Sequence, residues 1–100
     1  MSSVIREVKD GSDFAIAMAI RMEVFVREQG VPLECEMDDL DQTATHYLAT
    51  KEGAPAAVAR TRVADGVGYI ERVAVRKEHR GSGIGQELMQ HLIARLRAGR

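Results

Sequence analysis

Toward its C-terminal end the sequence reads Val73-Ala74-Val75-Arg76-Lys77-Glu78-His79-Arg80-Gly81-Ser82-Gly83-Ile84-Gly85. The quoted segment begins with apolar residues typical of a strand, and the residues after it carry an apolar face at helical spacing. That face consists of Ile84, Leu88, Met89, Leu92, Ile93 and Leu96. The sequence therefore predicts a strand that leads through a glycine-rich turn directly into an amphipathic helix.

This turn has the features of an anion site. The first backbone N–H groups of a helix have no partner inside the helix, and the helix dipole adds partial positive charge there. The glycines that follow Arg80 leave such donors uncovered by Cβ atoms, and Arg76 and Lys77 add formal positive charge. The residues alone thus predict a site for a pyrophosphate or a similar anion. The alternative is a turn that only allows the strand and the helix to pack closely.

Two common phosphate-binding motifs fit this turn poorly. A nucleotide P-loop needs Gly-Lys-Ser/Thr, whereas Gly85 is followed by Gln86 and Glu87. The dinucleotide fingerprint Gly-x-Gly-x-x-Gly belongs early in a strand–helix–strand unit. Here the spacing is Gly-x-Gly-x-Gly, near the end of the chain.

Upstream of the turn, the sequence predicts three antiparallel strands. Residues 46–51 and 55–63 have strand-like composition, and Asp65-Gly66 is a typical hairpin signal before a strand at 68–75. Strict alternation along this last strand would place Glu71 and Val73 on the same face.

The N-terminal part predicts a strand at residues 3–8 and a helix whose N-cap lies at residues 11–13. The apolar stripe of this helix consists of Phe14, Met18, Met22 and Phe25. Residues 33–45 are rich in acidic side chains and are expected to form a loop or a frayed helix. The whole order predicts an α+β fold with a mostly antiparallel sheet and flanking helices.

Composition points to one cytosolic domain. The chain has 100 residues, 45% of them hydrophobic, no apolar run reaches the roughly 18 residues of a membrane span, and residues 1–10 lack a signal-peptide pattern. A single cysteine, Cys35, allows no internal disulfide and agrees with a reducing, cytoplasmic compartment. The three histidines are scattered without ligand spacing, so we expect no metal site.

Charge is divided unevenly along the chain. Residues 1–50 hold four Lys/Arg and ten Asp/Glu, whereas residues 51–100 hold ten and five. This division suggests a ligand or partners of opposite charge, or simply a solvated acidic loop beside a solvated basic helix. The net charge of −1 and the lack of a basic, aromatic surface argue against nucleic-acid binding.

At the turn, the sequence resembles a known family. Arg80-Gly81-Ser82-Gly83-Ile84-Gly85 fits the Arg/Gln-x-x-Gly-x-Gly/Ala signature of the GNAT acetyltransferase superfamily, and the strand Glu71-Arg72-Val73-Ala74-Val75 precedes it as in that family. Residues 21–32, Arg-Met-Glu-Val-Phe-Val-Arg-Glu-Gln-Gly-Val-Pro, are similar to those of a bacterial subgroup of small single-domain GNAT proteins. Downstream, Glu36, Asp38, Asp41 and His46 add to this likeness.

The resemblance implies an N-acetyltransferase that uses acetyl-CoA as co-substrate and an amine as acceptor. The amine would attack the thioester directly, because no activated nucleophile is visible. The backbone of Val73, Ala74 and Val75 would pair with the pantetheine arm, and one of its N–H groups would polarise the thioester carbonyl. The pyrophosphate would lie on Arg80, Gly81, Ser82, Gly83, Ile84 and Gly85.

Glu71 is the candidate general base, because amine attack needs a group that removes the ammonium proton. The alternative is that Glu71 only forms an ion pair with Arg72 or Arg60. Acidic residues 34–41 are either an acceptor-binding surface or a solvated loop. His46 is expected to be a strand residue with a satisfied hydrogen bond.

GNAT folds normally continue after the helix that follows the glycine turn. We therefore expect residues 1–100 to be the N-terminal and cofactor-binding part of a GNAT domain, lacking its last strands and helix. The strand at 68–75 would then be an unpaired edge, which predicts self-association or a strand-completing partner. The alternative function is a non-catalytic CoA-binding or interaction module, or an inactive fragment of an acetyltransferase.

Overall fold

A four-stranded antiparallel sheet forms the centre of the computed structural model, which describes residues 3–99. Its order is β1 (Ser3–Glu7), β2 (Thr45–Lys51), β3 (Ala54–Ala64) and β4 (Val67–Val75), each strand next to its neighbour in sequence. The predicted hairpin at Asp65-Gly66 joins β3 to β4. Within the described residues β4 pairs only with β3, so the expected edge strand is present.

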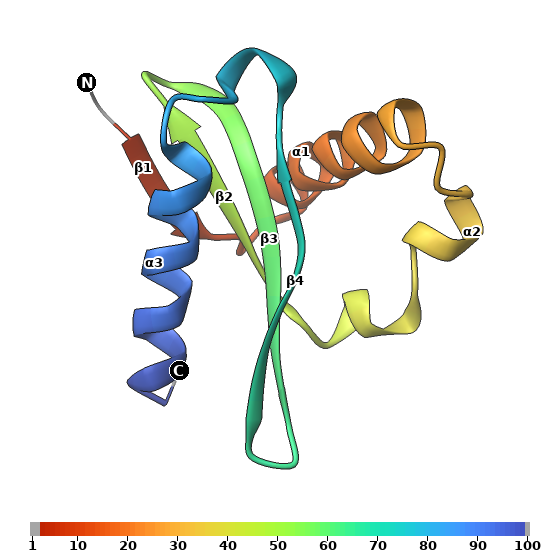
Figure 1. Ribbon diagram of the computed structural model, residues 1–100. Coiled ribbons are helices and arrows are strands. Elements are labelled where there is room, and N and C mark those ends of the chain that lie inside the picture. Colours follow the sequence, from red (N-terminus) through yellow and green to blue (C-terminus); the bar gives the residue numbers. More distant parts are fainter. Residues whose placement is uncertain (1–2, 100) are drawn as a thin grey trace.

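Helices cover both faces of the sheet (Figure 1). One face carries α1 (Gly11–Arg21), which continues as the π-helix η1 (Met22–Glu28), and the other carries α3 (Ile84–Arg97). The predicted α+β architecture is confirmed. None of the helices in residues 3–99 has the length and apolar character to cross a membrane.

Shorter helical segments complete the chain. The acidic region holds α2 (Leu33–Glu36) and the 3-10 helix η2 (Asp39–Gln42), and the 3-10 helix η3 (Lys77–His79) lies in the glycine-rich turn. The N-cap of α1 was expected at residues 11–13 but is Asp10, one position earlier, because the Oδ1 atom of Asp10 accepts a hydrogen bond from the Asp13 N–H at 2.8 Å.

Alternate residues of the sheet supply two separate cores. Tyr47 of β2 packs toward α3, where Leu88 and Leu92 are fully buried. Leu48 and Val58 face α1 instead. The α3 side of the sheet is built largely from alanines, and these small side chains allow the helix to lie close to the strands.

A β-bulge breaks the alternation expected along β4. Val58 pairs with Ala74 and Arg60 with Glu71, so the single residue between them on β3 faces two on β4, Arg72 and Val73. Glu71 lies on the α1 side, where it bonds to Arg60, whereas Val73 packs against the α3 core. The expectation that Glu71 and Val73 share a face was wrong, because one extra residue reverses every later side chain.

Candidate functional site

The glycine turn begins after β4 and ends at the N-terminus of α3. Gly81 has φ +81° and Gly83, the N-cap of α3, has φ +89°, and at both positions a Cβ atom would meet nothing within 4 Å. These two glycines are therefore needed for their left-handed backbone rather than for lack of space. Gly85 differs, because a Cβ atom there would lie 3.0 Å from Cγ2 of Val75. The packing explanation thus applies to Gly85.

Free backbone donors point out of the start of α3. Gly83 makes no side-chain cap, and the N–H groups of Ile84, Gly85 and Gln86 donate to no carbonyl within residues 3–99. A hydrogen bond from the sheet stabilises the turn, since Lys51 Nζ at the end of β2 donates to the Ser82 carbonyl at 3.2 Å. The turn therefore offers several amide donors at the positive end of a 14-residue helix.

Glutamates from a distant helix hold the arginines of the turn. Arg80 donates through Nε to the Val75 carbonyl at 3.0 Å and through NH2 to Glu28 of η1. Arg76 contacts Glu23 of the same helix at 3.4 Å. Sequence reasoning missed both glutamates, because they lie more than 50 positions from their partners.

The three strand residues expected to bind the pantetheine arm occupy the free edge of the sheet next to the turn. Val73 and Val75 pack toward α3, and Ala74 toward α1. A pocket of about 260 Å³ adjoins Val73 and is also lined by Phe25, Val31, Cys35, Glu36 and Arg72. The structure therefore brings the strand residues and the glycine turn to one end of β4, with a small pocket beside them.

Glu71 is held by two arginines. Arg62 donates from Nε and NH2 to the two carboxylate oxygens, each at 2.9 Å, and Arg60 Nε donates at 3.1 Å. Hydrogen bonding to Arg62 lowers the pKa of Glu71 most, burial opposes this shift, and Arg60 lowers the pKa further. The ion pair with Arg60 considered from sequence is present, whereas Arg72 bonds elsewhere.

Behind Glu71 lies an arginine–carboxylate network that joins α1, the acidic segment and the sheet. Arg21 Nε donates to Glu36 at 2.8 Å and its NH1 to Asp41 at 2.6 Å. Arg60 NH1 donates to the same Asp41 at 2.8 Å and to Asp38 at 2.7 Å. Arg72 closes the group with contacts to Glu36 at 3.3 Å and Asp38 at 3.2 Å.

Two of these carboxylates have clear pKa shifts. Hydrogen bonding to Arg60 lowers the pKa of Asp38 to about 2. Burial acts to raise the pKa of Asp41, but its bonds to Arg21 and Arg60 outweigh burial and lower it. The acidic segment is therefore not simply a solvated loop, since Glu36 and Asp41 are buried and paired.

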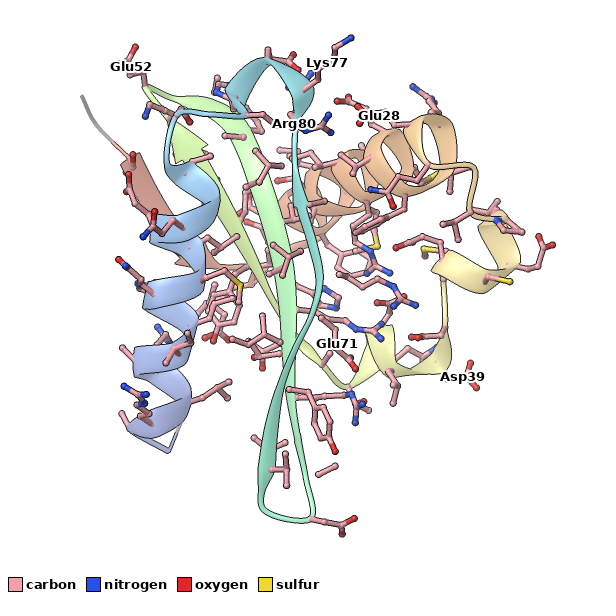
Figure 2. The ribbon with its side chains drawn as sticks, viewed as in Figure 1. Glu28, Asp39, Glu52, Glu71, Lys77 and Arg80 are labelled. Atoms are coloured by element: carbon pink, nitrogen blue, oxygen red, sulfur yellow. The ribbon has the colours of Figure 1, made fainter. Side chains whose placement is uncertain are left out.

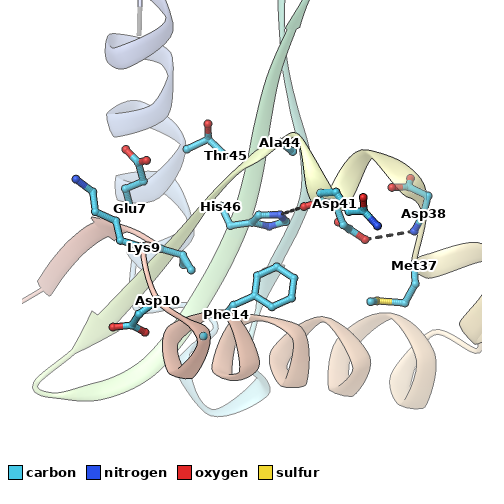
Figure 3. A pocket seen from close by; sticks show the side chains of 13 residues that line it. Glu7, Lys9, Asp10, Phe14, Met37, Asp38, Asp41, Ala44, Thr45 and His46 are labelled. Carbon is cyan, nitrogen blue, oxygen red and sulfur yellow. Dashed lines mark hydrogen bonds between the residues drawn. The ribbon is translucent and has the colours of Figure 1, made fainter.

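A second pocket, of about 760 Å³, opens between β1, α1, η2 and β2 (Figure 3). His46 on its wall donates from Nε2 to the Asp41 carbonyl at 2.9 Å and packs edge-on against Phe14. His46 is thus the hydrogen-bonded strand residue that was expected. None of the predicted donor-site residues lines this pocket. In residues 3–99, no group of three or more His, Cys, Asp or Glu side chains is placed to hold a metal ion.

Comparison with known proteins identifies the fold. Residues 15–99 match the Acetyltransferase (GNAT) family. The chain belongs to this family. It is 38% identical over 92 residues to the uncharacterized N-acetyltransferase YjcF of Bacillus subtilis strain 168, over 92% of this chain and 64% of that protein. The chain therefore spans less than two thirds of the length of this curated relative.

Solved structures of other bacterial proteins share the arrangement of strands and helices. ElaA of Escherichia coli superposes with a TM-score of 0.80 at 26% identity, over 93% of this chain and 68% of that one. An acyl-CoA N-acyltransferase from Pseudomonas aeruginosa gives 0.78 at 26% identity, over 93% and 66%. The family resemblance and the GNAT fold inferred from the glycine signature are both confirmed.

Proposed function

We propose that this GNAT chain binds acetyl-CoA and transfers its acetyl group to an amine. The observation that carries the proposal is the turn at the start of α3, where left-handed glycines, backbone amides without a carbonyl partner in residues 3–99 and Arg80 lie together. A pyrophosphate is the group that uses all three features, because it accepts several hydrogen bonds and carries negative charge. Gly81, Ser82, Gly83, Ile84 and Gly85 would surround it.

The rest of the donor would lie along the free edge of β4. The backbone of Val73, Ala74 and Val75 is proposed to pair with the amide groups of the pantetheine arm, as an added strand would. An N–H of this edge would then polarise the thioester carbonyl. The bulge at Arg72 supports this placement, since it changes the direction of the strand immediately before these three residues.

In the reaction, the amine nitrogen attacks the thioester carbonyl carbon, a C–N bond forms, and the C–S bond breaks to release the thiolate of CoA. An ammonium acceptor loses one proton before the attack, and Glu71 is the proposed acceptor of this proton, directly or through water. The second proton leaves the nitrogen after the C–N bond has formed and passes through water to the departing thiolate. Its lowered pKa keeps Glu71 ionised at neutral pH, and the same arginines make it a weak base. Glu71→Gln is expected to slow turnover most where the amine is protonated.

The acceptor is proposed to reach the thioester through the pocket beside Val73. With about 260 Å³ and Phe25 and Val31 in its wall, this pocket suits a small amine or the end of a longer one. In the acidic segment Glu34 and Asp39 are exposed, and their charge would attract a cationic acceptor.

Within residues 3–99 the outer edge of β4 pairs with no strand. The part of this edge before the bulge at Arg72, outside the residues proposed for the pantetheine arm, is proposed to take a further strand, from a second copy or from another segment. A strictly monomeric species in concentrated sedimentation runs would contradict pairing between copies. A bacterial, cytoplasmic location without a nucleic-acid or membrane partner is also proposed. The Bacillus subtilis relative supports the source, and the lone Cys35 and the use of acetyl-CoA agree with a reducing compartment.

The proposed transfer is tested by turnover with a panel of amines. Small amines, polyamines, an aminoglycoside and a peptide amino terminus are each incubated with the protein and acetyl-CoA, and released CoA thiol is measured. Thiol release that depends on one acceptor class supports an N-acetyltransferase. Binding of acetyl-CoA with no release for any acceptor would instead identify a CoA-binding module.

A further inference from the structure

Glu28 of η1 forms an ion pair with Arg80, the first residue of the glycine signature. The NH2 group of Arg80 donates to Oε1 of Glu28, the last residue of η1. Figure 2 shows the labelled Glu28 and Arg80 close together, between the helix and the turn. The contact joins two residues 52 positions apart. It lies beside the proposed anion site and is not needed to form the turn, which is held by Lys51 and Ser82.

The π-helical form of η1 explains how one helix reaches the turn twice. Glu23 contacts Arg76 at 3.4 Å, and Glu28 stands five residues later. In an α-helix, five residues would rotate the second side chain by about 140° from the first. The wider turn of a π-helix, with i→i+5 hydrogen bonds, brings both carboxylates to the same side. The two glutamates therefore approach neighbouring arginines of the same turn.

We propose that Glu28, supported by Glu23, competes with the phosphate groups of the donor for the arginines of the turn. The inference rests on the donor site proposed above. Carboxylates and phosphates both accept charge-assisted hydrogen bonds from guanidinium groups. The NH2 group of Arg80 that donates to Glu28 is therefore not available to donate equally well to a phosphate. The side chains of Arg80 and Glu28 are 44% and 29% exposed, and an open pair of this kind exchanges partners at little cost.

The competition would couple donor binding at the turn to the pocket proposed for the amine, because η1 contacts both. Phe25 of η1 and Val31 just after it line the small pocket beside Val73. When an anion takes Arg80, Glu28 is released, and the C-terminal end of η1 loses one of its attachments to the turn. Donor binding then changes the restraint on a wall of the pocket through which the amine is proposed to enter.

Titration calorimetry at low salt tests the competition with two probes, inorganic pyrophosphate and coenzyme A. Glu28→Gln keeps the size of the side chain and removes its charge. Glu52→Gln removes the same charge at the β2–β3 turn, on the other side of the glycine turn (Figure 2). Glu28→Gln is expected to bind both probes about two- to fivefold more tightly than the wild type, as loss of an open ion pair allows, and Glu52→Gln to change much less.

The two probes separate failure of this inference from failure of the proposed function. Two results would overturn the competition and leave the proposed donor intact. In the first, coenzyme A binds Glu28→Gln no more tightly than it binds the wild type. In the second, it binds Glu52→Gln as tightly as it binds Glu28→Gln. Pyrophosphate that binds Glu28→Gln more tightly, while coenzyme A binds none of the proteins, supports the competition and overturns the proposed donor. Absence of binding for both probes overturns both.

Discussion

In the arginine–carboxylate network, the side chains of Arg21 and Arg60 are each 2% exposed, and each bonds to two or three carboxylates. In the glycine turn, the side chains of Arg76 and Arg80 are 30% and 44% exposed. The same residue types therefore serve two purposes. The buried arginines stabilise the fold through ion pairs and are not free to bind a ligand, because a buried charge must be paired. Half-exposed arginines hold a carboxylate weakly and can exchange it for a ligand.

The strongest way to test this difference is to remove a buried arginine. Arg60→Ala leaves Asp38, Asp41 and Glu71 without their shared partner and is expected to lower the free energy of unfolding by about 3–5 kcal/mol. Urea denaturation measures the loss. Arg62→Ala, which removes a more exposed partner of the same Glu71, is expected to cost much less. Equal costs would show that burial does not distinguish the two arginines.

The opposite pattern is expected at the turn. Arg80→Ala should change the free energy of unfolding by less than about 1 kcal/mol, because its ion pair with Glu28 is open to solvent. The same change should weaken acetyl-CoA binding about tenfold, since one charge-assisted hydrogen bond to the anion is lost. Calorimetry and urea denaturation on the same sample compare the two effects. A large loss of stability with unchanged binding would place Arg80 with the buried arginines.

The acid dependence of stability should follow the network rather than the turn. The folded-state pKa of Asp38 is lowered to about 2, so its contribution is fully present above its usual value of 3.8 and is lost as the pH falls toward 2. Because Asp38 is partly exposed, we expect at most about 1 kcal/mol from it.

The variant Asp38→Asn tests this assignment. It should be less stable than wild type at neutral pH and lose less stability between about pH 4 and pH 2. Asp39→Asn is the matched control, since Asp39 is exposed and forms no ion pair within the described residues. Urea denaturation across this pH range measures all three proteins. An unchanged pH dependence in Asp38→Asn would contradict the assignment.

What the sequence predicted correctly was carried by local patterns. The glycine turn, the hairpin at Asp65-Gly66 and the apolar face of α3 each depend on residues close together in the chain, whose backbone preferences act directly. The candidate donor-site residues were named from the same continuous strand, turn and helix start together with the family resemblance. Their role in binding stays a prediction.

What was missed depends on residues far apart in the chain. The pairing of Arg21 with Glu36 and Asp41, and of Arg80 with Glu28, needs the folded chain before it can be seen. One pattern did carry information, because Arg21 interrupts an otherwise apolar helix face. A charge in such a place predicts a buried partner. The bulge at Arg72 had no such marker, and alternation therefore failed there.

The central claim is that the turn at the start of α3 binds the pyrophosphate of acetyl-CoA, and titration calorimetry with wild type, Gly83→Ala and Gly83→Glu tests it most directly. Both variants share the cost of a side chain at φ +89°. Only the second adds a carboxylate where the anion would lie. We predict micromolar binding to wild type, weaker binding to Gly83→Ala and none to Gly83→Glu. Equal affinity of all three folded proteins, or no binding to wild type, would contradict the claim.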